Sequence, residues 1–402
     1  RLVGSEMCIR DRITPEGTKD LLFNECIIRQ TIENRIHKIF RSHGYSELVT
    51  PSIEFYDVFN HNSRYFPQER LFKLTDCKGR LLVLRPDNTI PIARIVATRL
   101  KDAELPMRLY YNQCVFNMAP SLKGKSAQTV QTGIELIGSS SKMADLEVIS
   151  TAIEVLSSCS KTNFSLEIGD IRLFNELVNK LDVDDSRKET IREYIETKNY
   201  PALNDYLDSI GKNDITHALK KLPRLFGGEE VFEKASRLFS DEKIDAVLEG
   251  LKQLYKQVSC IIGSGNLTVD LGMVNRTDYY TGVIIKGYLE GYGEEVLSGG
   301  RYDKLISDFG YDVPATGFAV NVDAVSKVEL KHSPVTEPSS DVVVFAEKDY
   351  EMKALNKAQD LRNSGKTVEI SLFDTIEETK KYAEEKNIPS VISVGESITE
   401  VK

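Results

Sequence analysis

The chain has 402 residues and a formal net charge of -9, with 41% hydrophobic and 28% charged residues. These values are typical of a globular protein with more than one domain, and they argue against a broad nucleic-acid-binding surface. No apolar run is long enough to span a membrane, and the six scattered cysteines lack the C-x-x-C spacing of a zinc site. We therefore expect a cytoplasmic protein without a bound metal or cofactor.

The first hundred residues predict helices and short strands. Residues 1–12, RLVGSEMCIRDR, lack the apolar core of a signal peptide and resemble a translated sequencing adapter, so we expect a non-native leader. Isoleucines recur with helical spacing between residues 24 and 43, and Gly44 is typical of a helix end. YSELVTPSIEF predicts an interrupted strand, and RLFKLTDCKGRLLVLRPD predicts a hairpin. In TIPIARIVATRL, Thr89 is a candidate N-cap and Pro91 suits the first helical turn.

The rest of the chain alternates between strand and helix patterns. RLYYNQCVFNMA and SAQTVQTGIELIG predict strands on either side of a loop, followed by the helix MADLEVISTAIEVLSSC. Residues 170–260 are charged and mostly helical in pattern, which indicates an inserted subdomain. Strand patterns return at LTVDLG, YYTGVIIKGYLEG, EEVLSGGRYDKL and ATGFAVNVDAV. Residues 329–340 predict a linker, and residues 341–402 predict a small parallel sheet of βαβαβ order.

Six motifs occur together in this chain: GTKDLL, LRPDNTIPIAR, GIELIG, DYYTG, LSGGRYDKL and PATGFAV. In order and spacing they resemble the catalytic domains of histidyl-tRNA synthetases, over residues 13–328. Two stretches, LRPDNTIPIARIVATRL and DLGMVNRTDYYTGV, are most similar to a non-catalytic branch of that family, the regulatory subunits of ATP phosphoribosyltransferase. The resemblance implies an α+β, class II aminoacyl-tRNA synthetase-like fold: an antiparallel sheet flanked by helices, a helical insert and a small C-terminal α/β domain. It also implies a homodimer formed through the first helix and strand.

Amino-acid activation by ATP requires donors where negative charge shifts in the transition state, and in the synthetases three arginines supply much of this. The resemblance places Asn117, Asn275 and Ala324 at these positions, and Ala119 where the synthetases have a glutamate. A shift of one residue would bring Arg276 to the second position. Neutral side chains cannot neutralise a triphosphate, and the loss of one such donor typically costs about 3 kcal/mol. We therefore expect lost ATP-site positions and no enzymatic activity.

The amino-acid half of the site is expected to be kept. By resemblance, the residues that would bind histidine are Asp87, Thr89, Gln131, Glu135, Tyr279 and Tyr280. A buried ammonium and a buried imidazole each need a partner. The first three residues would address the ammonium, Glu135 would accept an imidazole N–H, and the tyrosine pair would close over the ring. Glu135 alone would more often belong to a structural pair, but its combination with Asp87, Gln131 and the tyrosine pair favours a ligand site.

The C-terminal residues 339–402 carry nine basic side chains against thirteen acidic ones. Because tRNA binding depends on Lys and Arg neutralising phosphates, a tRNA role is disfavoured. The resemblance implies a regulatory, activating subunit that binds L-histidine and joins a short catalytic ATP phosphoribosyltransferase chain in a hetero-octamer. Histidine would then inhibit the first step of histidine biosynthesis. Two alternatives stay open: a divergent histidyl-tRNA synthetase and a solitary histidine sensor.

Overall fold

The computed structural model describes residues 13–60, 66–118, 126–159, 162–274, 279–332 and 340–401. The predicted leader, residues 1–12, lies outside these ranges. The chain forms two compact units, residues 1–334 and 335–402. Among the described residues, no helix is long and apolar enough to cross a membrane, no cluster of side chains could hold a metal ion, and the five cysteines are free.

A large sheet forms the centre of the first unit. In the described part of the chain it has nine strands in the order β1-β5-β6-β12-β11-β10-β7-β9-β8. Neighbouring strands are antiparallel except the pairs β1–β5 and β7–β9. The strands are β1 (Ser46–Glu47), β5 (Met107–Phe116), β6 (Gln128–Ile137), β7 (Phe164–Asp170), β8 (Phe226–Gly227), β9 (Leu267–Asp270), β10 (Val283–Leu289), β11 (Leu297–Arg301) and β12 (Ala315–Asn321). The predicted α+β class, a largely antiparallel sheet flanked by helices, is confirmed.

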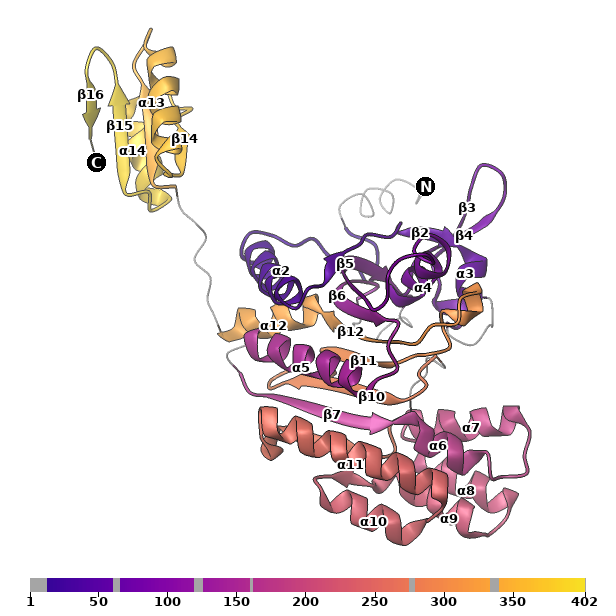
Figure 1. The fold of residues 1–402 in the computed structure, drawn as a ribbon. Helices are drawn as coiled ribbons and strands as arrows, with labels where there is room; N and C mark the ends of the chain where they lie inside the picture. Colours follow the sequence, from indigo (N-terminus) through magenta and orange to yellow (C-terminus); the bar gives the residue numbers. More distant parts are fainter. Residues whose placement is uncertain are drawn as a thin grey trace, which may run out of the picture. The chain divides into compact units, whose positions relative to one another are not determined.

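Three helices cover one face of this sheet: α2 (Asn24–Ser42), α5 (Lys142–Cys159) and α12 (Val322–His332) (Figure 1). The isoleucine stripe of α2 is buried, as its spacing predicts. The predicted start of the linker at residue 329 is wrong, because α12 continues to His332. The reason is burial: Val328 and Glu329 still lie in the interior, so the helix keeps its packing partners. Residues 333–339 of the predicted linker lie outside the described residues.

A second, three-stranded sheet has the order β2-β4-β3 and contains the predicted hairpin. Its elements and the helices next to it are β2 (Ile53–Phe55), α3 (Tyr56–Asn60), β3 (Lys73–Thr75), β4 (Leu81–Leu84) and α4 (Thr89–Thr98). The register pairs Ile53 with Leu84, Phe55 with Leu82, and Leu82 with Leu74. These five side chains share one face, which we call the apolar sheet face. Ile53 is 46% exposed and Phe55 is 44% exposed, so this face is incompletely covered within the chain.

Residues 171–262 form the predicted helical insert, which gathers beside β7 (Figure 1). Most of its helices begin at an Asp or Asn whose side chain accepts a backbone N–H of the first turn, as at Asp184, Asn199 and Asp241. The helices are α6 (Ile171–Val178), α7 (Asp185–Glu196), α8 (Tyr200–Ile210), α9 (Asp214–Lys221), α10 (Glu230–Leu238) and α11 (Glu242–Ile262). Short 3-10 helices lie at Gln68–Arg70, Leu222–Arg224, Ser264–Asn266 and Ser307–Phe309.

The second unit is a four-stranded sheet of order β14-β13-β15-β16. Its elements are β13 (Val342–Ala346), α13 (Glu351–Asn363), β14 (Val368–Ile370), α14 (Ile376–Glu385), β15 (Ser390–Val394) and β16 (Ile398–Glu400). The first three strands are parallel, as the βαβαβ order predicts. The antiparallel β16 was not predicted, because its three residues are all exposed and show no apolar alternation.

Candidate functional site

Strand β6 carries the centre of the predicted histidine site. Gln131, Gly133 and Glu135 alternate along it and therefore point to the same face of the large sheet. Tyr111 on β5 lies opposite Gly133, and Gly317 on β12 lies opposite Glu135. A Cβ at Gly317 would come within 2.1 Å of Glu135 Oε2. Glycine at this position therefore leaves the room that the carboxyl group occupies.

Glu135 is almost completely buried, with 1% exposure. Its Oε1 accepts a hydrogen bond of 2.9 Å from the Thr89 hydroxyl, and its Oε2 accepts one from the Tyr302 hydroxyl. The pKa of Glu135 is raised to about 8: burial has the largest effect, the hydrogen bonds from Tyr302 and Thr89 lower the pKa in part, and the nearby Asp87 carboxylate also raises it. No positively charged side chain among the described residues contributes to this pKa shift. Glu135 therefore holds its proton near neutral pH far more readily than an exposed glutamic acid does.

Aromatic hydroxyls surround this carboxyl group. The four side chains are Tyr111, Tyr279, Tyr280 and Tyr302. The ring centroids of Tyr279 and Tyr280 are 4.8 Å apart, and those of Tyr279 and Tyr302 are 5.8 Å apart. Burial raises the pKa of all four hydroxyls, so each remains a hydrogen-bond donor at neutral pH. The predicted tyrosine pair thus lies beside Glu135; its role in binding a ligand stays a prediction.

The prediction that Thr89 caps its helix is wrong. Helix α4 begins at Thr89 itself, and the Thr89 hydroxyl donates to Glu135. The backbone N–H of Ile90 is instead accepted by Asp87 Oδ1 at 2.8 Å. The physical reason is competition for the Thr89 hydroxyl. The buried Glu135 carboxyl group takes it as a hydrogen-bond donor, and Asp87 supplies the acceptor that the helix N-terminus needs.

The remaining predicted residues also lie near β6. Asn88 Nδ2 donates to Gln131 Oε1 at 3.4 Å, so the LRPDNT segment reaches β6 at two points along the strand. Burial raises the pKa of Asp87 to about 6, and its charge interacts with that of Glu135. All six predicted histidine-site residues are therefore gathered at this part of the large sheet.

Sequence reasoning missed Tyr302 and Tyr111. Tyr302 directly follows β11 in the SGGRYD motif. Its neighbour Arg301 pairs locally and lies 2.8 Å from Asp145 and 3.0 Å from Asp303. Tyr302 could have been found from its position directly after a strand that neighbours β12. Tyr111 carries no such local signal, because its place opposite Gly133 depends on the register of two strands.

The ATP side of the site shows neutral groups at two of the three predicted positions. Asn117 Nδ2 donates to the Pro86 carbonyl oxygen at 3.0 Å, so this amide serves to join two segments of the chain. Ala324 is 1% exposed within α12. An arginine at position 324 would not fit without repacking the interior. Asn275, the third position, and Ala119 lie outside the described residues.

Comparison with known proteins gives a consistent result. The family model described as Histidyl-tRNA synthetase matches residues 17–325. An ATP phosphoribosyltransferase regulatory subunit of Clostridium kluyveri is 44% identical, over 93% of this chain and 97% of its own length. The protein of the same name from Clostridium acetobutylicum is 42% identical over 96% of each chain. The chain belongs to the family of ATP phosphoribosyltransferase regulatory subunits. Its relatives are named as regulatory chains, not as catalytic ones.

A solved structure agrees with this membership in the family. The ATP phosphoribosyltransferase regulatory subunit/histidyl-tRNA synthetase from Bacillus halodurans C superimposes with a TM-score of 0.83 at 30% sequence identity. The match covers 95% of this chain and 98% of that structure. The class II synthetase-like fold is therefore shared along nearly the whole length of both chains.

This member of the family uses the arginine of its LRPD motif structurally. Arg85 is buried, and its Nη1 lies 2.8 Å from the Thr50 carbonyl oxygen and 2.5 Å from Gln113 Oε1. Its Nε donates to the Cys114 carbonyl oxygen at 2.7 Å, and its own carbonyl oxygen accepts the Phe116 N–H. Arg85 therefore ties β5 to the segment that precedes β2. Its Nη1 and Nε hydrogens are directed at the chain's own oxygens.

Arg85→Met should lower the free energy of unfolding by about 3 kcal/mol, because it leaves buried carbonyl and amide oxygens without a donor. Urea denaturation followed by circular dichroism measures this difference. The matched control is Arg237→Met, which removes an exposed ion pair with Glu233 within α10 and should have a much smaller effect. An equal effect of both substitutions would contradict the structural role of Arg85.

Glu135→Gln should make stability less dependent on pH. The pKa of Glu135 is about 8 in the folded chain and 4.5 for an ordinary glutamic acid. The folded state thus retains a proton that the unfolded state loses, so this contribution is complete below about pH 4.5 and disappears as pH rises to about 8. Between these limits the free energy of unfolding should fall, relative to the variant, by about 1 kcal/mol per pH unit. Urea titrations at several pH values test this, with Glu167→Gln on β7 as control.

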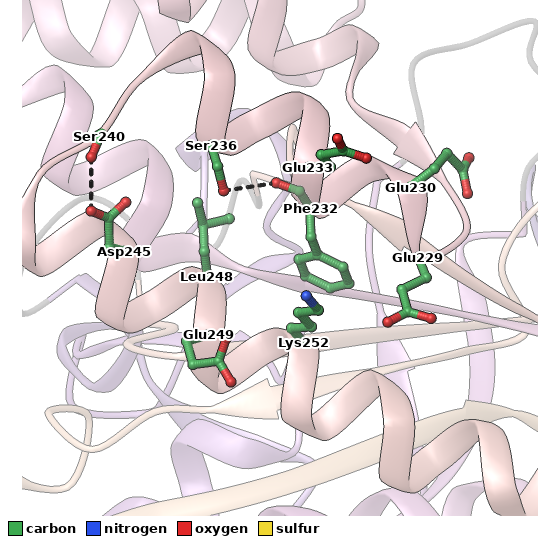
Figure 2. Close-up of a pocket in the computed structure, with 10 residues that line it drawn as sticks. All are labelled: Glu229, Glu230, Phe232, Glu233, Ser236, Ser240, Asp245, Leu248, Glu249 and Lys252. Carbon is green, nitrogen blue, oxygen red and sulfur yellow. Dashed lines mark hydrogen bonds between the residues drawn. The ribbon is translucent and has the colours of Figure 1, made fainter.

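A groove of about 800 Å³ lies elsewhere, between α10 and α11 of the insert (Figure 2). Five carboxylates and one cation line it: Glu229, Glu230, Glu233, Asp245, Glu249 and Lys252. This acidic lining repels phosphate groups, so the groove offers a nucleotide no alternative site.

Proposed function

We propose that this chain is the regulatory and activating subunit of an ATP phosphoribosyltransferase and binds histidine as its feedback inhibitor. The observation that carries the histidine site is the buried carboxyl group of Glu135, which is enclosed by tyrosines and close to Asp87. The neutral Asn117 and the buried Ala324, by contrast, cannot hold the phosphates of ATP. A site that can bind an amino acid without activating it is suited to sensing.

The proposed partner is a short catalytic chain that joins ATP to phosphoribosyl pyrophosphate in the cytoplasm, within a hetero-octamer. The names of the relatives, which are regulatory subunits of this transferase, support this choice. Histidine would favour the less active state of the assembly. Because coupling between sites is reciprocal, the partner's active state must then weaken histidine binding by the same factor.

The homodimer through the first helix and strand stays a prediction; we propose that the apolar sheet face, which includes the Ile53–Phe55 part of that strand, forms part of its interface. Ile53 and Phe55 are large, apolar and nearly half exposed, and they adjoin three leucines on the same face. An exposed apolar patch of this kind is typical of a surface that another protein chain covers in the assembled state. The acidic balance of residues 339–402 supports a protein partner over tRNA.

Titration calorimetry of the purified chain tests the histidine site directly. We expect heat of binding with L-histidine and none with ATP at the same concentration. Reconstitution with the short catalytic chain should then raise its transferase activity, and histidine should reduce that activity again.

Three other outcomes separate the alternatives. Histidine-dependent exchange of pyrophosphate into ATP would identify a histidyl-tRNA synthetase. Histidine binding without any effect on the transferase would identify a solitary sensor. Absence of histidine binding would remove the pocket assignment altogether.

A further inference from the structure

We propose that Glu135 carries a proton in the ligand-free chain and transfers it to the imidazole ring of the incoming histidine, so that binding creates an imidazolium–carboxylate pair. This inference rests on the proposed histidine site and deepens it. It specifies the form of the ligand that the pocket selects: an amino acid whose ring is neutral in solution and basic enough to accept a proton.

The geometry around Glu135 provides no charge that would keep the empty site ionised. From the start of α4 and the turn before it, Thr89 and Asp87 face the carboxyl group; the first is neutral and the second is acidic. The tyrosine side chains from β5, from the segment before β10 and from the end of β11 are neutral. A carboxyl group with 1% exposure and no described cation beside it is more stable with its proton than without it.

The proposed proton transfer from Glu135 to the imidazole ring is balanced. The O–H bond of Glu135 breaks, its electron pair remains on the carboxylate, and the lone pair of one imidazole nitrogen forms the new N–H bond. Free imidazole has a pKa of about 6.5, so at neutral pH the ligand arrives mostly without this proton. Glu135 therefore supplies this proton, and no net proton is exchanged with solvent.

The same residues stabilise the pair after transfer. The Thr89 and Tyr302 hydroxyls already point at the two carboxyl oxygens and would hydrogen-bond the carboxylate more strongly once it is charged. The tyrosine rings and the Asp87 carboxylate suit a cationic ring, through cation–π contact and charge attraction. The site thus has donors for an anion and partners for a cation within one cluster, although the empty state is neutral at Glu135.

Difference infrared spectroscopy of the full chain, with and without L-histidine, tests the transfer. We expect histidine to remove the carbonyl band of a protonated carboxyl group, and we expect no such loss in Glu135→Gln. In parallel, calorimetry near neutral pH in buffers of different ionisation enthalpy should give the same heat, since no net proton is taken up. 1,2,4-Triazole-3-alanine, which has the size of histidine but a much less basic ring, should bind at least about tenfold more weakly.

The outcomes are distinguishable. Histidine binding without loss of the carboxyl band, or with uptake of one proton from the buffer, overturns the transfer and leaves the proposed function intact. Equal affinity for the triazole analogue overturns it as well. If histidine does not bind at all, the proposed function fails together with the inference. Glu167→Gln serves as the control for folding, because Glu167 accepts a tyrosine hydroxyl on the same sheet but outside the site.

Discussion

Glu135→Ala is expected to weaken histidine binding by about a hundredfold and to remove histidine inhibition of the reconstituted transferase. The substitution deletes the group that would hold the imidazole ring and leaves the Thr89 and Tyr302 hydroxyls without their acceptor. A buried hydrogen bond to a charged group is worth about 1.5 to 3 kcal/mol, which corresponds to a factor of about 10 to 150 in affinity. Calorimetry with L-histidine and inhibition assays on the assembled pair measure the two effects.

The matched control is Glu167→Ala. Glu167 lies on β7 of the same sheet and accepts a hydrogen bond of 3.0 Å from the Tyr288 hydroxyl. It therefore makes the same type of glutamate–tyrosine contact as Glu135 and Tyr302, but away from the candidate site. It should leave histidine affinity unchanged within about twofold. If Glu135→Ala retained normal inhibition while the assembly stayed intact, the histidine pocket would lie elsewhere.

Ile53→Asp is expected to convert the proposed homodimer into a monomer. In a two-fold symmetric interface each substitution occurs twice, so two carboxylates would be buried without partners. The resulting loss should exceed a hundredfold in the dimer dissociation constant, because an unpaired buried charge costs several kcal/mol. Sedimentation velocity at several protein concentrations gives the association state, and circular dichroism checks that the fold is retained.

Leu372→Asp provides the comparison for this experiment. Leu372 is 92% exposed in the second unit and lies outside the apolar sheet face, so its replacement tests whether any exposed apolar residue has the same effect. We expect it to leave the dimer unchanged. A dimer that survives Ile53→Asp would move the interface away from this face.

The fold was largely predictable because its signals are local and motif-based. The isoleucine spacing of α2 and the motifs around β6 and β12 are readable in sequence, and the structure bears them out. What failed depended on distant packing. The end of α12 extends because Glu329 is buried by neighbours that are remote in sequence, and the exposed β16 has no apolar pattern to reveal it.

In the candidate site, too, the local features were predictable and the contacts between distant segments were not. Glu135 and Gln131 were found from their spacing on one strand and from the family resemblance. The bond from Thr89 to Glu135 was not foreseen, because a hydroxyl at a helix start suggests a cap unless a buried acceptor is known to lie nearby. Tyr302 contacts Glu135 across 167 residues of sequence, and such a contact depends on strand order.

The hydrogen bond from Asn117 to the Pro86 carbonyl would make the proposed loss of the ATP site hard to reverse. An arginine restored at position 117 would bring back one cation, yet it would withdraw the amide that now holds the end of β5 to the segment before α4. The neighbouring Arg85 is committed to the same junction and cannot be redirected to a phosphate. A single back-substitution therefore loses structural support before it regains any chemistry. Engineering a synthetase from this scaffold would require rebuilding the junction first, with several changes introduced together.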